Sequence, residues 1–221
     1  MSEVVDLIGA APARVSEVEW QARVELAACY RLVHYYGWTD QVYNHITLRI
    51  PGTGHLLINE FGLRYDEITP SSLVKIDISG KQIDGDPRPV NLAGYTIHSA
   101  VHAARPDDLH CVLHTHSDNA VALSCLDCEF MPITQTGCAF DGRVGYHEFE
   151  GIALDLQERA RLVSDLGDTN HTLVLRNHGV LTAGESAAIT FHRLYSFEQA
   201  AGIQLRVMAA SGASGVPIRK P

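Results

Sequence analysis

Two histidines, His114 and His116, stand one residue apart at the end of an apolar run that begins at Leu109. Residues i and i+2 of a β-strand point to the same face, so the two imidazoles are predicted to lie side by side. Imidazole nitrogen is a common zinc ligand, and this spacing suits two ligands on one metal ion. The pair is also compatible with two polar residues at a strand end, and the motif alone leaves both interpretations open.

A third histidine, His178, comes just after a second expected strand, which contains the apolar run Leu173–Leu175, and precedes Gly179. The ends of strands are a usual location for ligand sites. A third imidazole from such a position would complete a three-histidine set with one open coordination position, the form that catalytic zinc sites take. A further pair, His98 and His102, has the spacing of metal ligands on a helix, but Ser99 stands where zinc proteases carry glutamate. We expect this second pair to form a helix face with polar contacts.

The composition excludes several functional classes. The chain has 221 residues, is 46% hydrophobic and carries a formal charge of −9, from 26 acidic and 17 basic residues. These values describe one globular domain, and the acidic balance argues against a nucleic-acid-binding surface. No apolar run approaches the roughly 18 residues of a membrane span, and the N-terminal sequence lacks the pattern of a signal peptide. We therefore expect a cytoplasmic protein without membrane or nucleic-acid partners.

The five cysteines do not indicate a disulfide framework, because their number is odd and they are scattered along the chain. Cys125 and Cys128 form a C-x-x-C motif, but the second such pair that a structural zinc site needs is absent. We expect both to be small buried residues, with a redox or metal role as the alternative.

The elements that position the histidines can be outlined from the sequence. A capping box at Ser16 and Glu19 begins an amphipathic helix. The expected strands are 45–50, 55–58, 73–78, 109–114 and 172–176, and the further expected helices are 91–104, 117–123, 152–166 and 185–210. This mixture indicates an α/β or α+β domain but does not give the strand order. We expect the domain to span residues 16–210, between an N-terminal arm (1–15) and a flexible C-terminal tail (211–221).

Five short segments, spread over almost the whole chain, share the order and spacing of one protein family. Tyr43–Arg49 has the form N-H-[IL]-[ST]-x-R, and Leu56–Gly62 reads as a strand followed by a glycine turn. The other segments are His98–Asp107, His114–His116 and Arg176–Gly179. On these motifs the chain resembles the class II aldolase/adducin domain family.

Within that family the chain is more similar to the adducin head than to the sugar-phosphate aldolases. Asn91–Ala100 and Gly145–Gly151 resemble the corresponding adducin segments. Adducin carries a long regulatory and cytoskeleton-binding tail, whereas this sequence stops soon after its last expected helix. We therefore expect no cytoskeletal role.

The resemblance implies a fold, an assembly and a metal. The implied fold is a single three-layer α/β/α domain around a largely antiparallel central sheet. The implied assembly is a cyclic homotetramer with active sites at the subunit interfaces. The family's metal ligands fall on His114, His116 and His178. The metal is a divalent ion, most often zinc, with manganese or iron as alternatives; in the aldolases it acts as a Lewis acid and stabilises the enediolate.

Two departures from the aldolase pattern change the expected substrate. The aldolases carry an acidic residue four positions before the histidine that matches His98, and Gly94 stands there in this chain. Glycine offers neither a metal ligand nor a base. The hydroxyl residues that hold the substrate phosphate are replaced by Leu92-Ala93 and by Phe61. A non-phosphorylated substrate with an apolar or aromatic part fits these changes better than a sugar phosphate.

Other residues are candidates for the missing base, each with a solvated or hydrogen-bonded surface group as the alternative. They are Glu60 in the turn beside the expected pocket, Tyr146, His147 and, on the last helix, Glu198. The resemblance also assigns substrate binding to Asn44, which matches an aldolase asparagine, and to the glycine turn at Gly62.

The favoured function is a metal-dependent carbon–carbon lyase, of aldolase or decarboxylase type, acting on a small non-phosphorylated hydroxy- or keto-acid. Two alternatives stay open. Three neutral imidazoles hold Fe(II) as well as Zn(II), which allows a non-haem iron oxygenase of aromatic keto-acids. Gly94 and the missing phosphate donors allow a non-catalytic, adducin-like oligomeric binding module.

Overall fold

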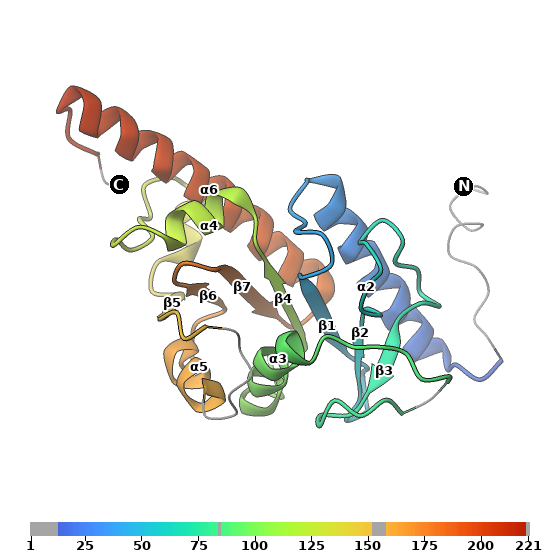
Figure 1. The fold of residues 1–221 in the computed structure, drawn as a ribbon. Coiled ribbons are helices and arrows are strands. Elements are labelled where there is room, and N and C mark those ends of the chain that lie inside the picture. Colours follow the sequence, from blue (N-terminus) through green and yellow to red (C-terminus); the bar gives the residue numbers. More distant parts are fainter. Residues whose placement is uncertain (1–12, 84, 152–157, 220–221) are drawn as a thin grey trace.

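The computed structural model describes residues 13–83, 85–151 and 158–219, which contain one seven-stranded sheet (Figure 1). Neighbouring strands are antiparallel, except that the last two in the spatial order are parallel. The prediction of a largely antiparallel central sheet is therefore confirmed. In spatial order the strands are β3 (Val74–Ile76), β2 (Leu56–Ile58), β1 (His45–Arg49), β4 (Cys111–Thr115), β7 (Gly179–Gly184), β6 (Thr172–Leu175) and β5 (Val144–His147).

Helices cover both faces of the sheet (Figure 1). One face carries α2 (Glu17–Tyr35), α4 (Asp118–Ser124) and α6 (Ala187–Ser214). The opposite face carries α3 (Leu92–Ala104) and α5 (Glu158–Leu166). A short 3-10 helix, η1 (Gly137–Phe140), packs against α6. The arrangement confirms the three-layer α/β/α fold.

Each face of the sheet has its own apolar core. Leu113 of β4 belongs to the core under α2 and α6, whereas the preceding residue, Val112, belongs to the core under α3 and α5. Successive side chains of a strand point to opposite faces, so a fully buried strand such as β4 contributes to both layers. Its burial on both faces explains why Cys111–Leu113 is a continuous apolar stretch rather than an alternation of apolar and polar residues.

Polar caps begin the helices at the predicted places. The backbone N–H of Glu19 donates to the Ser16 hydroxyl at 3.2 Å and fixes the start of α2. The backbone N–H of Gly94 donates to the Asn91 side chain at 3.3 Å and fixes the start of α3. Gly94 therefore lies in the first turn of α3, packed against the strand that begins at His45.

Two strands are absent from the sequence-based outline. β5 has only four residues, and β7 has six but begins and ends with glycine, a residue that weakens a strand signal. β7 inserts between β4 and β6 and so joins two segments that the outline leaves unconnected. The last helix ends at Ser214 rather than at Ala210, so the expected tail begins inside it.

The structure tests three other predictions, on the arm and the helix 152–166, on the C-x-x-C cysteines and on membrane-spanning helices, only in part or against the expectation. The expected arm and the helix expected over 152–166 include residues 1–12 and 152–157, which lie outside the described residues. Cys125 is exposed and Cys128 is half-buried, so the prediction that both are buried is wrong. Among the described helices, none combines the length and the apolar character that a membrane crossing requires.

Candidate metal centre

The ends of two strands and one turn bring His114, His116 and His178 together. His114 lies in β4, His116 follows directly after that strand, and His178 lies in the turn between β6 and β7. Because β7 pairs with both β4 and β6, this turn lies beside the end of β4. The ligand nitrogens of the three imidazoles all lie within 4.8 Å of one another. The predicted three-histidine cluster is therefore present.

Two of these imidazoles already use their second ring nitrogen within the protein. His114 Nδ1 donates to the backbone oxygen of Val180 at 3.1 Å, and His116 Nδ1 donates to the Asp40 carboxylate at 2.8 Å. Since both partners only accept, each Nδ1 carries a hydrogen, and in the neutral form that a metal ligand requires each Nε2 carries a lone pair. The two Nε2 atoms are 2.9 Å apart, and two lone pairs at that distance repel each other unless a cation lies between them.

This donor set fits a divalent metal ion. Zinc binds imidazole nitrogen at 2.0–2.1 Å, so neighbouring nitrogens of a tetrahedral site are about 3.3 Å apart. The 2.9 Å between His114 Nε2 and His116 Nε2 is close to this value. Asp40 behind His116 forms the carboxylate–histidine arrangement that orients a metal ligand and raises its basicity. Three protein ligands leave a coordination position for water or substrate, as in catalytic zinc sites.

Burial favours the neutral form that a metal ligand requires in two of the three imidazoles, His114 and His178. Desolvation, followed by the nearby His116 and His147, lowers the pKa of His178 to about 4. Desolvation, together with the surrounding imidazoles, holds the pKa of the buried His114 well below its ordinary value. Near neutral pH no proton therefore competes with a metal ion for His114 and His178.

The carboxylate of Asp40 is expected to strengthen metal binding without touching the ion. An Asp40→Ala variant loses the acceptor for His116 Nδ1, so that ring can rotate and change tautomer. Loss of such an outer partner lowers metal affinity roughly 10–100-fold. Competition with a zinc chelator measures the change, and Asp107→Ala, which removes an exposed carboxylate, is the matched control. Equal zinc affinity of the Asp40→Ala variant and the wild-type protein would contradict this role.

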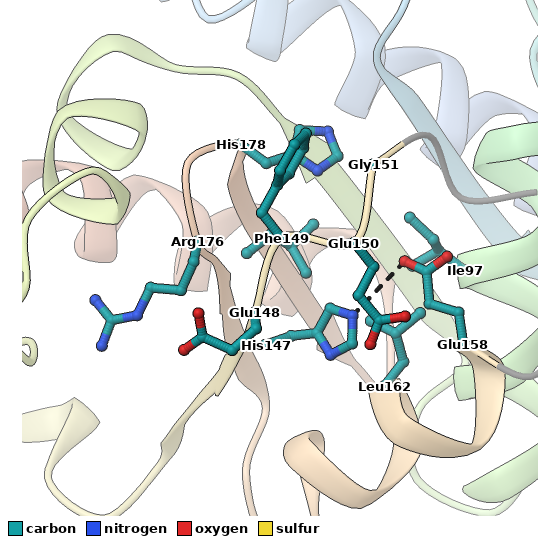
Figure 2. A pocket seen from close by; sticks show the side chains of 11 residues that line it. Ile97, His147, Glu148, Phe149, Glu150, Gly151, Glu158, Leu162, Arg176 and His178 are labelled. Atoms are coloured by element: carbon teal, nitrogen blue, oxygen red, sulfur yellow. Dashed lines mark ion pairs between the residues drawn. The ribbon is translucent and has the colours of Figure 1, made fainter.

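The three imidazoles line a cavity of about 430 Å³, a size that suits a small molecule. Phe61, Ile97 and Phe149 supply apolar walls, and Figure 2 shows the Phe149 ring next to His178. Among the described residues that line this cavity there is no lysine, arginine, serine or threonine. The described walls therefore lack the usual partners of a phosphate group.

Two candidates for the missing base are engaged away from this cavity. The Glu60 carboxylate lies 3.9 Å from the Arg88 guanidinium, and its neighbour in the chain, Phe61, lines the cavity instead. The Tyr146 hydroxyl accepts a hydrogen bond from the backbone N–H of Phe130 at 2.7 Å, and the Arg176 guanidinium covers its ring. Neither side chain is brought to the three imidazoles.

The other two candidates are buried and have structural partners. His147 Nδ1 bonds to Asp165 at 2.7 Å, and Figure 2 shows its Nε2 directed toward the Glu158 carboxylate, 3.6 Å away. Glu198 accepts hydrogen bonds from the Ser117 hydroxyl and from the first backbone N–H groups of α4. It therefore caps a helix.

The residues assigned to substrate binding have different surroundings. Asn44 is buried and does not line the cavity; its side-chain oxygen accepts from the backbone N–H of Asp40 at 2.7 Å. It thus holds the loop that carries the partner of His116. Gly62 adopts a φ of 102°, which favours glycine, in the turn after Phe61.

Sequence reasoning missed Asp40 and His45. Asp40 lies 76 residues before His116, and no local pattern connects the two. His45 is part of the motif that contains Asn44, but its place opposite His114 becomes visible only from the register of β1 with β4. His45 could have been identified as a site residue only if the pairing of β1 with β4 had been known.

Comparison with known proteins agrees with this architecture. The class II aldolase and adducin N-terminal domain matches residues 24–205. An aldolase II superfamily protein from Pseudomonas syringae is 49% identical, with a TM-score of 0.88 over 96% of this chain and 85% of that chain. L-fuculose 1-phosphate aldolase from Glaciozyma antarctica is 30% identical, with a TM-score of 0.78 over 93% of this chain and 80% of that chain. Rat (Rattus norvegicus) alpha-adducin is 39% identical over 96% of this chain and 29% of its own length. The chain therefore belongs to the class II aldolase and adducin N-terminal domain family.

Proposed function

We propose that the protein is a metal-dependent carbon–carbon lyase, of aldolase or decarboxylase type, acting on a small non-phosphorylated hydroxy- or keto-acid. The observation that carries the proposal is the pair of lone pairs on His114 and His116, 2.9 Å apart and beside His178 at the cavity. Membership of a family that includes aldolases supports a lyase rather than another use of the metal.

The three imidazoles would hold a divalent ion, for which we propose zinc, with manganese or iron as alternatives. When bound, the ion supplies Lewis-acid polarisation of a carbonyl or carboxylate oxygen of the substrate. The protein itself orients the ligands and surrounds the site with apolar side chains. Asp40 fixes the ring of His116, and the rings of Phe61 and Phe149 form apolar walls beside the site. A small acid with an apolar part suits such walls.

A non-phosphorylated substrate leads to a direct prediction. Fuculose 1-phosphate and ribulose 5-phosphate are expected to leave the melting temperature of the zinc-loaded protein unchanged and to give no product. The reason is that no lysine, arginine, serine or threonine lines the described part of the cavity, whereas the Asp40 carboxylate does. Differential scanning fluorimetry over millimolar concentrations measures the shift, with an established fuculose 1-phosphate aldolase as positive control. A concentration-dependent rise in melting temperature would overturn the exclusion of phosphates.

Metal analysis of the purified full chain tests the proposal as a whole. One zinc or manganese ion per chain, with turnover of hydroxy- or keto-acids, supports the lyase. Iron, with oxygen consumption on aromatic keto-acids, would replace the lyase with an oxygenase. A wild-type protein that takes up no metal, even on reconstitution, would contradict both.

Similarity to alpha-adducin favours one alternative, a non-catalytic oligomeric binding module. Gly94, which removes the aldolase acid, is consistent with it. We also propose a homotetramer with active sites at the subunit interfaces. The apolar rings of Tyr43 and Phe149, which line the cavity but are 53% and 58% exposed, support an interface there. Light scattering coupled to size-exclusion chromatography decides between the 24.2 kDa monomer and a tetramer.

A further inference from the structure

A buried line of hydrogen bonds, here called the relay, connects a backbone carbonyl to the cavity. The Leu109 oxygen bonds to His102 Nδ1 at 3.1 Å, and His102 Nε2 bonds to the Thr47 hydroxyl at 2.8 Å. The same hydroxyl bonds to His98 Nδ1 at 2.8 Å, and His98 Nε2 bonds to His45 Nδ1 at 2.9 Å. All four side chains are at most 3% exposed. The relay thus runs from the core to the wall of the metal centre.

The direction of every bond in the relay follows from its inner end. The Leu109 carbonyl can only accept, so His102 Nδ1 carries the hydrogen and His102 Nε2 must accept from Thr47. The Thr47 oxygen then accepts from His98 Nδ1, and His98 Nε2 accepts from His45 Nδ1. A doubly protonated ring would break this order, but burial lowers the pKa of His102 to about 3. His45 is therefore left with a bare lone pair on Nε2.

That lone pair has no partner within the described part of the protein. His45 lines the cavity, and the centre of its ring lies 5.1 Å from that of His114. A Cβ atom at Gly94 would lie 2.1 Å from His45 Nε2, so the imidazole occupies the space that a side chain at position 94 would need. His45 stays outside the group of three histidines whose ligand nitrogens converge. It is thus placed as a neighbour of the metal ligands rather than as a fourth ligand.

We propose that His45 Nε2 accepts a hydrogen bond from a hydroxyl group of the substrate, which makes a hydroxy-acid the substrate class of this site. The inference rests on the proposed function, because the carboxylate of the same molecule would be held at the metal centre. His98, Thr47 and His102 are then positioning residues, since they act only by fixing the tautomer of His45. The side chain that Gly94 lacks is replaced, in space and in hydrogen bonding, by an imidazole from the neighbouring strand.

Binding of L-lactate and propionate to the zinc-loaded full chain tests the proposal, because the two acids differ in one hydroxyl group. The wild-type protein should prefer lactate. His45→Phe removes the acceptor but keeps a ring, and should reduce this preference about tenfold, the value of one hydrogen bond. Zinc content should not change, and His192→Phe, on an exposed ring, should behave as wild type. Loss of zinc in His45→Phe, or an unchanged preference, overturns the proposal.

Ring-nitrogen spectra test the relay without a ligand. Long-range proton–nitrogen correlation spectra of the labelled protein should show His45, His98 and His102 with hydrogen on Nδ1. Thr47→Val removes the hydroxyl that joins His102 Nε2 to His98 Nδ1. His45 and His98 should then no longer be fixed in this tautomer, and the lactate preference should fall. Hydrogen on His45 Nε2 in the wild-type protein overturns the inference. A wild-type protein that binds no zinc contradicts the proposed function instead. The spectra still show, in that case, whether the hydrogen bonds of the relay have the inferred direction.

Discussion

A His178→Ala variant of the full chain is expected to lose its metal and keep its fold. His178 lies half-buried in the turn between β6 and β7, so alanine there opens no closed cavity in the core. The remaining pair, His114 and His116, still presents two nitrogens to an ion. Structural zinc sites with four ligands bind with about 10–16 kcal/mol, so one ligand contributes about 2.5–4 kcal/mol, or roughly 100-fold to 1000-fold in affinity.

Mass spectrometry of the purified protein and competition with a zinc chelator measure this effect. The variant should contain almost no metal at concentrations that saturate the wild-type protein, and any lyase activity should disappear with it. His192→Ala is the matched control, because His192 is exposed on α6. A circular dichroism spectrum like that of the wild-type protein shows that the fold is kept. Full zinc occupancy in the His178→Ala variant would remove the basis of the metal centre.

The metal ligands could be predicted because each follows an apolar strand. Such runs are visible in the sequence; His114 and His116 lie at the end of β4, and His178 lies three residues after the end of β6. The helices were predictable for a similar reason, since Ser16 and Asn91 supply the caps that begin them. These features depend on residues that are close together in the chain.

The surroundings of the ligands could not be predicted in the same way. Asp40 and His45 reach the site through the pairing of β1 with β4, and β7, which completes the site, carries too weak a strand signal. Glu60 and Tyr146 are candidates by their place near family motifs, but the structure gives each another partner. Strand order and register decide which polar side chains meet, and neither is encoded in a local pattern.

A Gly94→Ala substitution is expected to destabilise the protein, although alanine normally stabilises a helix. Gly94 lies in α3 and has an ordinary helical conformation, so the exchange alone would add about 0.5–1 kcal/mol to the free energy of unfolding. The new Cβ, however, would lie 2.0 Å from Cδ2 and 2.1 Å from Nε2 of His45. Overpacking of this kind costs about 1–3 kcal/mol, which corresponds to a melting temperature lower by roughly 2–12 °C in a protein of this size.

The matched control is Gly212→Ala in α6, where a Cβ meets nothing within 4 Å and slight stabilisation is expected. The decisive comparison is Gly94→Ala in a His45→Ala background, because the imidazole that causes the clash is then absent. The penalty should vanish there, which gives a coupling energy between the two positions of about the whole cost of Gly94→Ala. A penalty of equal size in both backgrounds would mean that α3 itself, and not His45, requires glycine. Coupling would show that position 94 and His45 compete for one volume at the edge of the metal centre, so an acid at 94 and an imidazole at 45 are alternative solutions for the same place.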